Sequence, residues 1–458
     1  MSTLVRAAAS VSVLAEPITF RNGKKAPNRI MKSPLTEKLY DWTDHSVSKR
    51  GIPSQAIKNI YSKWGQGGFG LIVTGMFVVD PKYISEAGQG IICEENSPQE
   101  LSVLAKALKS NGSLAIAQLS HPGSKAITDY TNASDKKHVI SDDLQDPITF
   151  SKQQLKDEVI SRFAFAASEL YKNGFDGIEL LACHGMIFNQ FLSPSNQRDD
   201  DNGGSLENRA RLLFDVLNAV RRAVPENTGF LVGVKMNSRD FQETEEEKKD
   251  VIRLCELIEA AGFDFVEVTG GMMEMTMPAL RDSTVTRENY FAQFVTETSR
   301  IFKKTVIYIT GGWQTAGSMA SSIELGPGLG IRPAGIQTCI FFLPNGEAAV
   351  SRPGLRPARP TTAREAEQAE KAAAGRGRPN SQPWLGLTNG VGLARWSAAE
   401  PDFPRKLLAG EITGYTANGF PPFDFWYQKN AALWQVRSMA EKGTPTDFTV
   451  AQECENFM

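Results

Sequence analysis

The stretch NGFDGIELLACHGMIFNQFLSPSNQRDDDNGGSLENRAR, from Asn173 to Arg211, decides the fold of this chain. Its first half contains a short apolar run, Gly177 to Cys183, which is typical of a strand covered on both faces. Its second half begins a helix at Ser205, a residue type that caps helix N-termini, and apolar residues follow at helical spacing. His184 comes directly after the strand, and α/β barrels carry their active sites at this end of their strands. We therefore expect the chemistry in the loop between the strand and the helix.

Short apolar runs alternate with amphipathic helices along most of the chain, which indicates βα units and a parallel sheet. Eight strand candidates in this rhythm predict an α/β fold, a (β/α)8 TIM barrel rather than an open sheet. The predicted strands are Arg29 to Pro34, Gly70 to Gly75, Leu114 to Ser120, Gly177 to Cys183, Leu231 to Asn237, Phe265 to Gly271, Val306 to Gly312, and Gly390 to Arg395. The predicted helices include Asp157 to Asn173, Ser205 to Val224, Glu245 to Ala261, and Arg287 to Phe302.

A long segment between the seventh helix and the eighth strand breaks this rhythm. Residues 327–385 are rich in Pro, Gly, Ala and Arg and have no sustained hydrophobic period, a composition that does not easily build a packed layer. We interpret the segment as a disordered low-complexity insertion on the N-terminal face of the barrel, or as a gene-model artefact such as translated intron. A partner-binding segment is the third interpretation. The barrel then comprises residues 1–326 and residues 386–440, which supply strand 8 and helix 8, and residues 441–458 form a C-terminal tail.

Size and charge favour a protein that acts on a small molecule. The chain has 458 residues, 41% of them hydrophobic, which suffices for one barrel with insertions. A net charge of -2 offers no electrostatic footprint for nucleic acid or an anionic membrane. No segment is apolar over the roughly 18 residues that a membrane span needs. We therefore predict neither a nucleic-acid partner nor a membrane partner, and the sequence leaves a homo-oligomer open.

The cysteines and the N-terminus bear on location. Five cysteines, far apart and without a Cys-x-x-Cys pair, predict neither a disulfide framework nor a metal or iron–sulfur centre. A reducing compartment fits best, and we expect a cytoplasmic protein. The N-terminal MSTLVRAAASVSVLAEPITF is too weakly apolar for a secretory signal, and Arg6 leaves an organelle transit peptide as the alternative.

The opening stretch resembles the old yellow enzyme family of FMN-dependent oxidoreductases. In that family a strand ending His-Ala-Ala-His-Gly-Tyr, or similar, is followed by Gln-Phe-Leu-Ser-Pro and Gly-Gly-Ser-Leu-Glu-Asn-Arg. The last two motifs stand unchanged here at residues 190–194 and 203–209. The resemblance covers about residues 18–326 and 387–439, and it implies a barrel that binds FMN and takes electrons from NADPH or NADH.

Two features of the residues themselves fit a flavin nucleotide. Lys235 is a cation inside an otherwise apolar strand, so it must meet an anion. Glycines and Arg395 end the seventh and eighth strands, where barrels commonly bind phosphate. The resemblance gives Lys235 a place beside flavin N1 and O2, and it packs the end of the first strand against the isoalloxazine. The implied cofactor-binding residues are Ser33, Pro34, Leu35, Thr36, Gly75, Gln118, Lys235, Gly311, Gly312, Ala394 and Arg395.

The substrate side departs from the family pattern. His184 keeps the second histidine position and is the expected catalytic residue, but Leu181 stands where the first histidine is usual and Met186 where the tyrosine is usual. In the family the paired side chains hydrogen-bond the substrate carbonyl, and the tyrosine protonates the α-carbon. Losing one such donor costs ~10²–10³ in rate and losing a general acid ~10²–10⁴. Water or Tyr40 could supply the proton, so we place Leu181, Met186 and Tyr40 in a substrate pocket of apolar character.

Three functions therefore stay open. The first is an NAD(P)H-driven FMN oxidoreductase that reduces an activated alkene or a related small molecule. The second is a flavin-binding biosynthetic oxidase or isomerase, or a weakly active pseudo-enzyme, which Leu181 and Met186 favour. The third is a flavin-free phosphate-binding barrel enzyme. The flavin-side motifs favour the first.

Overall fold

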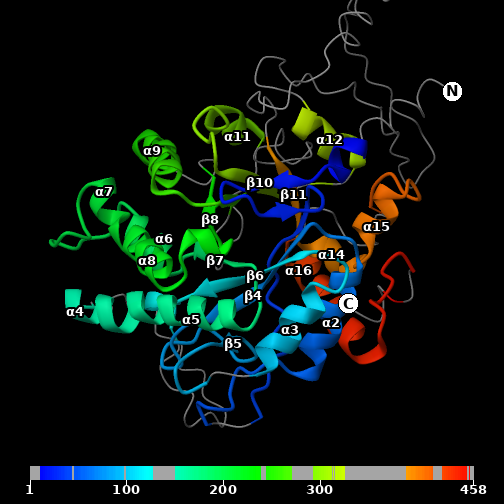
Figure 1. Cartoon of the computed structure of the whole chain (residues 1–458), viewed down its shortest axis with the longest axis horizontal. Coiled ribbons are helices and arrows are strands. Elements are labelled where there is room, and N and C mark those ends of the chain that lie inside the picture. The colour runs from blue at the N-terminus through cyan, green and yellow to red at the C-terminus, as the bar shows by residue number, and fades with distance from the viewer. Residues whose placement is uncertain are drawn as a thin grey trace, which may run out of the picture. The chain divides into compact units, whose positions relative to one another are not determined.

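The computed structural model describes residues 11–43, 46–96, 99–126, 150–238, 244–270, 292–311, 313, 315–324, 388–415, 425–450 and 453. Within these residues, eight parallel strands close into a barrel, because β3 pairs with both β11 and β4 (Figure 1). The barrel strands are β3 (Ile30–Lys32), β4 (Leu71–Val78), β6 (Leu114–Ser120), β7 (Gly177–Ala182), β8 (Leu231–Asn237), β9 (Phe265–Thr269), β10 (Val306–Thr310) and β11 (Gly390–Leu393). Each lies within or overlaps a predicted strand, so the predicted (β/α)8 barrel is confirmed.

Helices surround the strands on the outside of the barrel (Figure 1). The longer ones are α2 (Gln55–Gln66), α3 (Glu100–Leu108), α5 (Ser161–Lys172), α8 (Arg211–Ala223), α9 (Glu245–Ala261), α11 (Ala292–Thr298), α12 (Ala316–Glu324) and α16 (Phe425–Lys442). The shorter ones are α4 (Lys152–Gln154), α6 (Ile187–Leu192), α7 (Leu206–Arg209), α14 (Arg395–Ala399) and α15 (Phe403–Leu408). A short strand β5 (Gly90–Ile91) extends the sheet beside β4, and the hairpin β1 (Ile18–Thr19) and β2 (Lys25–Ala26) precedes β3.

The predicted helices are correct in place; α9 has the predicted bounds, and the others differ at their ends. The helix predicted from Ser205 to Val224 is two helices, α7 and α8, which meet at Ala210. Ser205 caps the first of them as predicted, since its side chain accepts a hydrogen bond from the Asn208 backbone N–H at 3.4 Å. The helix predicted from Asp157 begins instead with a π-helical turn, Leu155–Ile160, before α5.

The inside of the barrel is apolar at its N-terminal end. Side chains from several strands fill this end together with Phe20 of the hairpin loop, and Phe265 and Tyr308 lie edge to face with ring centroids 6.3 Å apart. A second apolar cluster fills the layer between the strands and the helices. Since the N-terminal end is packed shut, any ligand must enter at the C-terminal ends of the strands.

The predicted insertion, residues 327–385, lies outside the described residues, and the proposed domain boundaries stay a prediction. The chain divides into one unit of residues 1–325 and 386–458 and another of residues 326–385. The chain on either side of the second unit is described: the Thr388 backbone N–H donates to the Ser322 carbonyl of α12 at 3.2 Å. The Thr388 hydroxyl also donates to the Ile307 carbonyl near the start of β10, at 2.7 Å. The described residues on either side of the segment are therefore tied to each other and to the start of β10.

Candidate active site

The catalytic loop follows β7 and turns sharply at His184. His184 has a backbone φ of 57°, in the left-handed region, and the next residue, Gly185, has a φ of 74°. For a residue other than glycine this conformation costs on the order of 1–3 kcal/mol, and such residues concentrate at functional sites. A side chain at Gly185 would also collide with Lys125, because an added Cβ would lie 2.5 Å from its Nζ. The two residues turn the chain immediately after the strand and hold His184 at the mouth of the barrel.

The residues after His184 fasten this loop to the neighbouring one. Asn189 accepts a hydrogen bond from the Gly185 N–H at 2.8 Å. The Gln190 amide donates to the carbonyls of Gly185 at 2.7 Å and Pro122 at 2.9 Å, the latter in the loop after β6. Asn189 and Gln190 thus hold the turn at His184 in place through hydrogen bonds to both loops.

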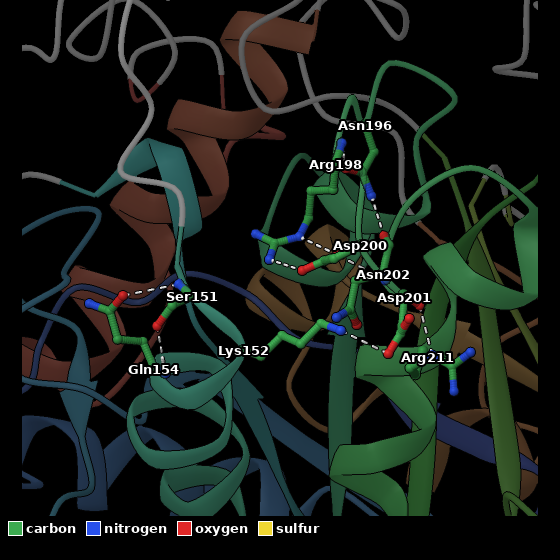
Figure 2. Close-up of polar contacts among 9 residues, drawn as sticks. All are labelled: Ser151, Lys152, Gln154, Asn196, Arg198, Asp200, Asp201, Asn202 and Arg211. Carbon is green, nitrogen blue, oxygen red and sulfur yellow. Dashed lines mark hydrogen bonds and ion pairs between the residues drawn. The ribbon is translucent and has the colours of Figure 1, made fainter.

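The acidic loop that follows is held by its own polar side chains (Figure 2). Arg198 pairs with Asp200 through two contacts, Nε to Oδ1 at 3.1 Å and Nη2 to Oδ2 at 2.5 Å. Asn196 donates to the Asn202 carbonyl at 2.7 Å and thereby closes the loop. Gly203 must be glycine, because an added Cβ would lie 1.8 Å from the Arg198 carbonyl oxygen. These contacts close the loop on itself and fix its shape.

A layer of polar side chains crosses the inside of the barrel above the apolar end. Gln118 on β6 and Glu179 on β7 are register partners, and the Gln118 amide donates to Glu179 at 2.7 Å. Lys235 on β8 and Glu267 on β9 are also register partners, and their Nζ and Oε1 atoms lie 2.8 Å apart. All four side chains are buried. The predicted anion for Lys235 therefore exists within the protein as Glu267.

These contacts leave hydrogen-bonding capacity in both predicted flavin-side residues. An ammonium has three donors, and an amide has two donors and an acceptor. Lys235 forms an ion pair with Glu267, and Gln118 uses one donor on Glu179. Asn237, at the C-terminal end of β8, has a buried side-chain oxygen without a hydrogen-bond partner in the described part of the chain. This set of donors and acceptors is of the kind that a pyrimidine edge requires.

The predicted residues from the first, seventh and eighth strands gather at one side of the mouth. Ser33 is buried, and its hydroxyl lies 2.7 Å from the Thr310 hydroxyl at the end of β10. Next to Thr310, Gly311 has a φ of 146°, which favours glycine. Gly312 lies outside the described residues. The partly exposed members of the set are Pro34, Leu35, Thr36, Gly311, Ala394 and Arg395.

The substrate side of the mouth is apolar. Leu181 and Met186 are 3% and 0% exposed, and they pack with Met76 and Cys183 in one small cluster. Leu181 is the register partner of Lys235, which places it beside the polar layer. The two residues that we expect to depart from the family pattern thus belong to one buried, apolar and sulfur-rich cluster.

His184 is a neutral imidazole in this environment. Burial, with the Lys235 and Lys125 cations nearby, lowers the pKa of His184 to about 3. Its Nδ1 lies 3.4 Å from the Sγ of Cys183, whose thiol pKa burial raises well above its usual range. An imidazole nitrogen is the better acceptor and a thiol sulfur a poor one, so the neutral thiol donates to Nδ1. The proton of the imidazole then sits on Nε2, which can donate a hydrogen bond to a ligand.

Two other predicted residues have packing roles in the structure. Gly75 is enclosed by protein, since an added Cβ would lie 1.9 Å from Glu37 Oε2, and its N–H donates to the Tyr61 hydroxyl at 2.7 Å. Tyr40 packs against Phe77 with ring centroids 5.1 Å apart, and burial raises the pKa of Tyr40 well above its usual range. These surroundings disfavour proton donation by Tyr40, whereas the flavin contact expected of Gly75 stays a prediction.

Comparisons with known proteins identify the family. The sequence profile of the NADH:flavin oxidoreductase / NADH oxidase family matches residues 13–326. The chain belongs to this family. It is 33% identical to the NADH-dependent flavin oxidoreductase nadA of Aspergillus parasiticus, over 70% of this chain and 75% of the relative. It is 31% identical to an NADPH dehydrogenase of Geobacillus thermodenitrificans, over 66% of this chain and 85% of the relative.

Solved structures show the same fold. An old yellow enzyme homologue from Zymomonas mobilis is 17% identical, with a TM-score of 0.57 over 88% of this chain and 94% of the other. Morphinone reductase is also 17% identical, with a TM-score of 0.56 over 88% of this chain and 91% of the other. These structures confirm the fold, and the family match together with the relatives confirms the resemblance: the protein is an NAD(P)H-dependent FMN oxidoreductase.

Reasoning from the sequence missed three groups of this site. The carboxyls of Glu179 and Glu267 interrupt buried strands at positions that share a face with Gly177 and Phe265, and this alternation could have pointed them into the barrel. Cys183 carried no signal, because a lone cysteine in an apolar run is usually core.

Two further observations complete the description. Among the helices that the structure describes, none combines the length and apolar character that crossing a bilayer requires. The described residues hold no group of His, Cys, Asp and Glu side chains that could bind a metal ion.

Proposed function

We propose that this FMN oxidoreductase reduces an activated alkene conjugated to a carbonyl, with NADPH or NADH as the electron donor and His184 as the residue that polarises the carbonyl. The carrying observation is the position of His184, held in a left-handed turn directly after β7 with its Nδ1 3.4 Å from Cys183 of the apolar cluster. A neutral imidazole can donate one hydrogen bond to a carbonyl oxygen as negative charge develops on it. Cys183 is the positioning residue, because its contact with Nδ1 selects the tautomer that donates from Nε2.

We assign the FMN contacts to the polar layer and to the partly exposed side of the mouth. Lys235 and Gln118 would hold the pyrimidine edge, and Ser33 to Thr36 would lie along the ring. Arg395 with the backbone at Gly311, Gly312 and Ala394 would hold the phosphate, since an Arg–phosphate pair is charge-assisted and bidentate. FMN bound there supplies hydride transfer between the nicotinamide and the alkene.

The proton that completes the reduction comes from solvent in this proposal. Met186 has no acidic proton, and Tyr40 is buried behind Phe77 with a pKa well above its usual range. One hydride from NAD(P)H and one proton from water then add across the alkene, so the atoms balance. The apolar cluster suits a substrate that is hydrophobic around its reacting carbons.

A second function is favoured by the same apolar cluster. Oxidation or redox isomerisation of a substrate needs no residue that protonates a carbon, and Leu181 and Met186 would then be no handicap. The family match and the NADH- or NADPH-dependent relatives nevertheless favour the NAD(P)H-driven reaction.

The absorbance spectrum of the purified protein tests the proposal first. We expect a flavin spectrum that bleaches on anaerobic addition of NADPH or NADH and returns when an enone is added. A spectrum without flavin would refute the assigned site. A flavin that NAD(P)H bleaches and that no enone reoxidises would instead support the second function.

A further inference from the structure

Two carboxyl groups and one ammonium meet inside the barrel, and the proposed mechanism uses neither carboxyl. Glu179 and Glu267 are both 0% exposed. Lys235 is the cation beside them, 2.8 Å from Glu267. Glu179 receives its hydrogen bond from a neutral group, the Gln118 amide, at 2.7 Å. If both carboxyls are ionised, these three groups together carry one net negative charge.

An unbalanced charge at this depth is costly, so the two carboxyls should hold one proton between them. Two buried carboxylates that share a site cannot both ionise easily, and the pKa of one of them rises strongly. Burial and the negative charge of Glu267 raise the pKa of Glu179 well above its usual range. Burial alone would raise the pKa of Glu267, but the Lys235 ammonium outweighs burial and lowers it. Cys183 and His184, which face the same layer, are both neutral.

The contacts also say which carboxyl carries the proton. Glu179 Oε1 accepts from Gln118, and Glu179 Oε2 is buried without an N–H or hydroxyl donor in the part of the chain that the structure describes. Both oxygens of Glu267 also lack a hydrogen-bond donor within the described residues, but Oε1 lies 2.8 Å from the Lys235 ammonium. A proton on Glu179 Oε2 can be donated to Glu267, which gives Glu267 a hydrogen bond and leaves it as the anion of the pair beside the ammonium.

We propose that Glu179, Glu267 and Lys235 form an overall neutral triad with one proton on Glu179, and that the negative charge of Glu267 sets the reduction potential of the bound flavin. The inference rests on the proposed function, which places FMN against Lys235. FMN gains negative charge on reduction, and a cation at Lys235 stabilises that charge. The Glu267 carboxylate opposes this effect through its ion pair with Lys235. Glu267 is therefore a positioning and tuning residue, and Glu179 holds it in place.

The test is a matched pair of substitutions in the same layer, Glu179→Gln and Glu267→Gln. Because the proposal makes Glu179 neutral, Glu179→Gln exchanges one neutral hydrogen-bonding group for another and should leave the midpoint potential of the flavin nearly unchanged. Removing the negative charge of Glu267 should make the flavin easier to reduce. Since Glu179 can ionise when Glu267 is gone, the double variant Glu179→Gln/Glu267→Gln should show the full effect. We expect it to raise the ratio of reduced to oxidised flavin at least tenfold at a fixed potential, about 30 mV for a two-electron couple.

A second measurement locates the proton without using the flavin. The infrared carbonyl band of a protonated carboxyl should be present in the parent at neutral pH and weaker in Glu179→Gln by one group, in the apoprotein as well as in the holoprotein. The infrared measurement needs only the Glu179→Gln variant, so it locates the proton even if the Glu267 variants fold poorly. The inference is overturned if Glu179→Gln shifts the potential as far as the double variant, or if it leaves the carboxyl band intact. Failure to bind FMN would refute the proposed function, whereas the infrared result would still decide the shared proton.

Discussion

Restoring the two missing polar groups of the substrate site is the most informative perturbation of this protein. The double variant Leu181→His/Met186→Tyr reinstates a second hydrogen-bond donor and a phenolic proton. The register places residue 181 opposite Lys235, whose positive charge disfavours an imidazolium. A histidine there should therefore be neutral and able to donate. Each restored group is worth about 10²-fold or more in the chemical step, so we expect a combined gain of at least ~10²-fold with simple enones.

The same substitutions should lower stability, because the cluster is already filled. Met186 is 0% exposed, and replacing it by the larger tyrosine overpacks a closed group, at a cost of typically 1–3 kcal/mol. The gain in rate must therefore be measured at a temperature where the variant is fully folded. A matched control is Leu181→Met/Met186→Leu, which perturbs the same cluster and adds no polar group.

Anaerobic stopped-flow measurement separates the two half-reactions. Flavin reduction by NADPH should change little in the double variant, since it needs no proton donor to the substrate. In the control variant, flavin reduction by NADPH should be unaltered and reoxidation of the flavin by simple enones should stay slow. If the parent already reduces cyclohexenone-type substrates as fast as the double variant, the interpretation of positions 181 and 186 is wrong.

Three further predictions concern the cofactor, the insertion and acid stability. Arg395→Ala should weaken FMN binding on the order of 10- to 100-fold in a flavin titration, while Arg395→Lys keeps the charge without the bidentate geometry and should fall between; unchanged affinity in Arg395→Ala would remove the phosphate assignment. Replacing residues 327–385 by a short Gly-containing turn should leave a folded yellow protein, because Thr388 and Ser322 on either side are hydrogen-bonded at 3.2 Å, and a colourless or unfolded product would contradict this. His121 and His184 have pKa values lowered to about 3 by burial first and nearby cations second, so the unfolded chain binds more protons than the folded one below the ordinary histidine pKa. The free energy of unfolding should fall from about pH 6.5 toward pH 3, by up to about 1.4 kcal/mol per pH unit for each histidine, and His184→Asn should reduce that slope in denaturant titrations.

Much of the fold followed from local patterns, since each barrel strand is a separate apolar run with its own turn signals. The position of His184 followed for the same reason: the end of β7 is visible as the point where the apolar run stops. The cap at Ser205 was also local and is confirmed. The NADH:flavin oxidoreductase motifs added the cofactor, which no periodicity could have given.

The contacts between distant residues of the site could not be predicted from the sequence, because they depend on how the strands are arranged in the closed barrel. Glu179 and Glu267 are far apart in the chain, and they meet only because β7, β8 and β9 lie side by side in one register. Tyr40 lies on the loop after the first strand, and its contact with Phe77 likewise joins residues that are far apart in the chain. Strand alternation could have pointed the two carboxyls inward, but which side chains then meet depends on the register of the assembled strands, and short-range patterns carry no information about that.

The difference in polarity between the two sides of the barrel mouth suggests how His184 can act as the single hydrogen-bond donor to the substrate carbonyl. The flavin side keeps a polar layer with Lys235 and Gln118, whereas the substrate side is lined by Leu181, Met186 and Met76. A hydrogen bond is electrostatically stronger in such a low-dielectric site than beside water. The one donor left, His184, therefore acts on the carbonyl with more effect than it would in a wetter pocket, provided that the substrate itself excludes water. A large apolar substrate meets that condition and a small enone does not, which is why slow turnover of simple enones and a preference for bulky hydrophobic ones should occur together.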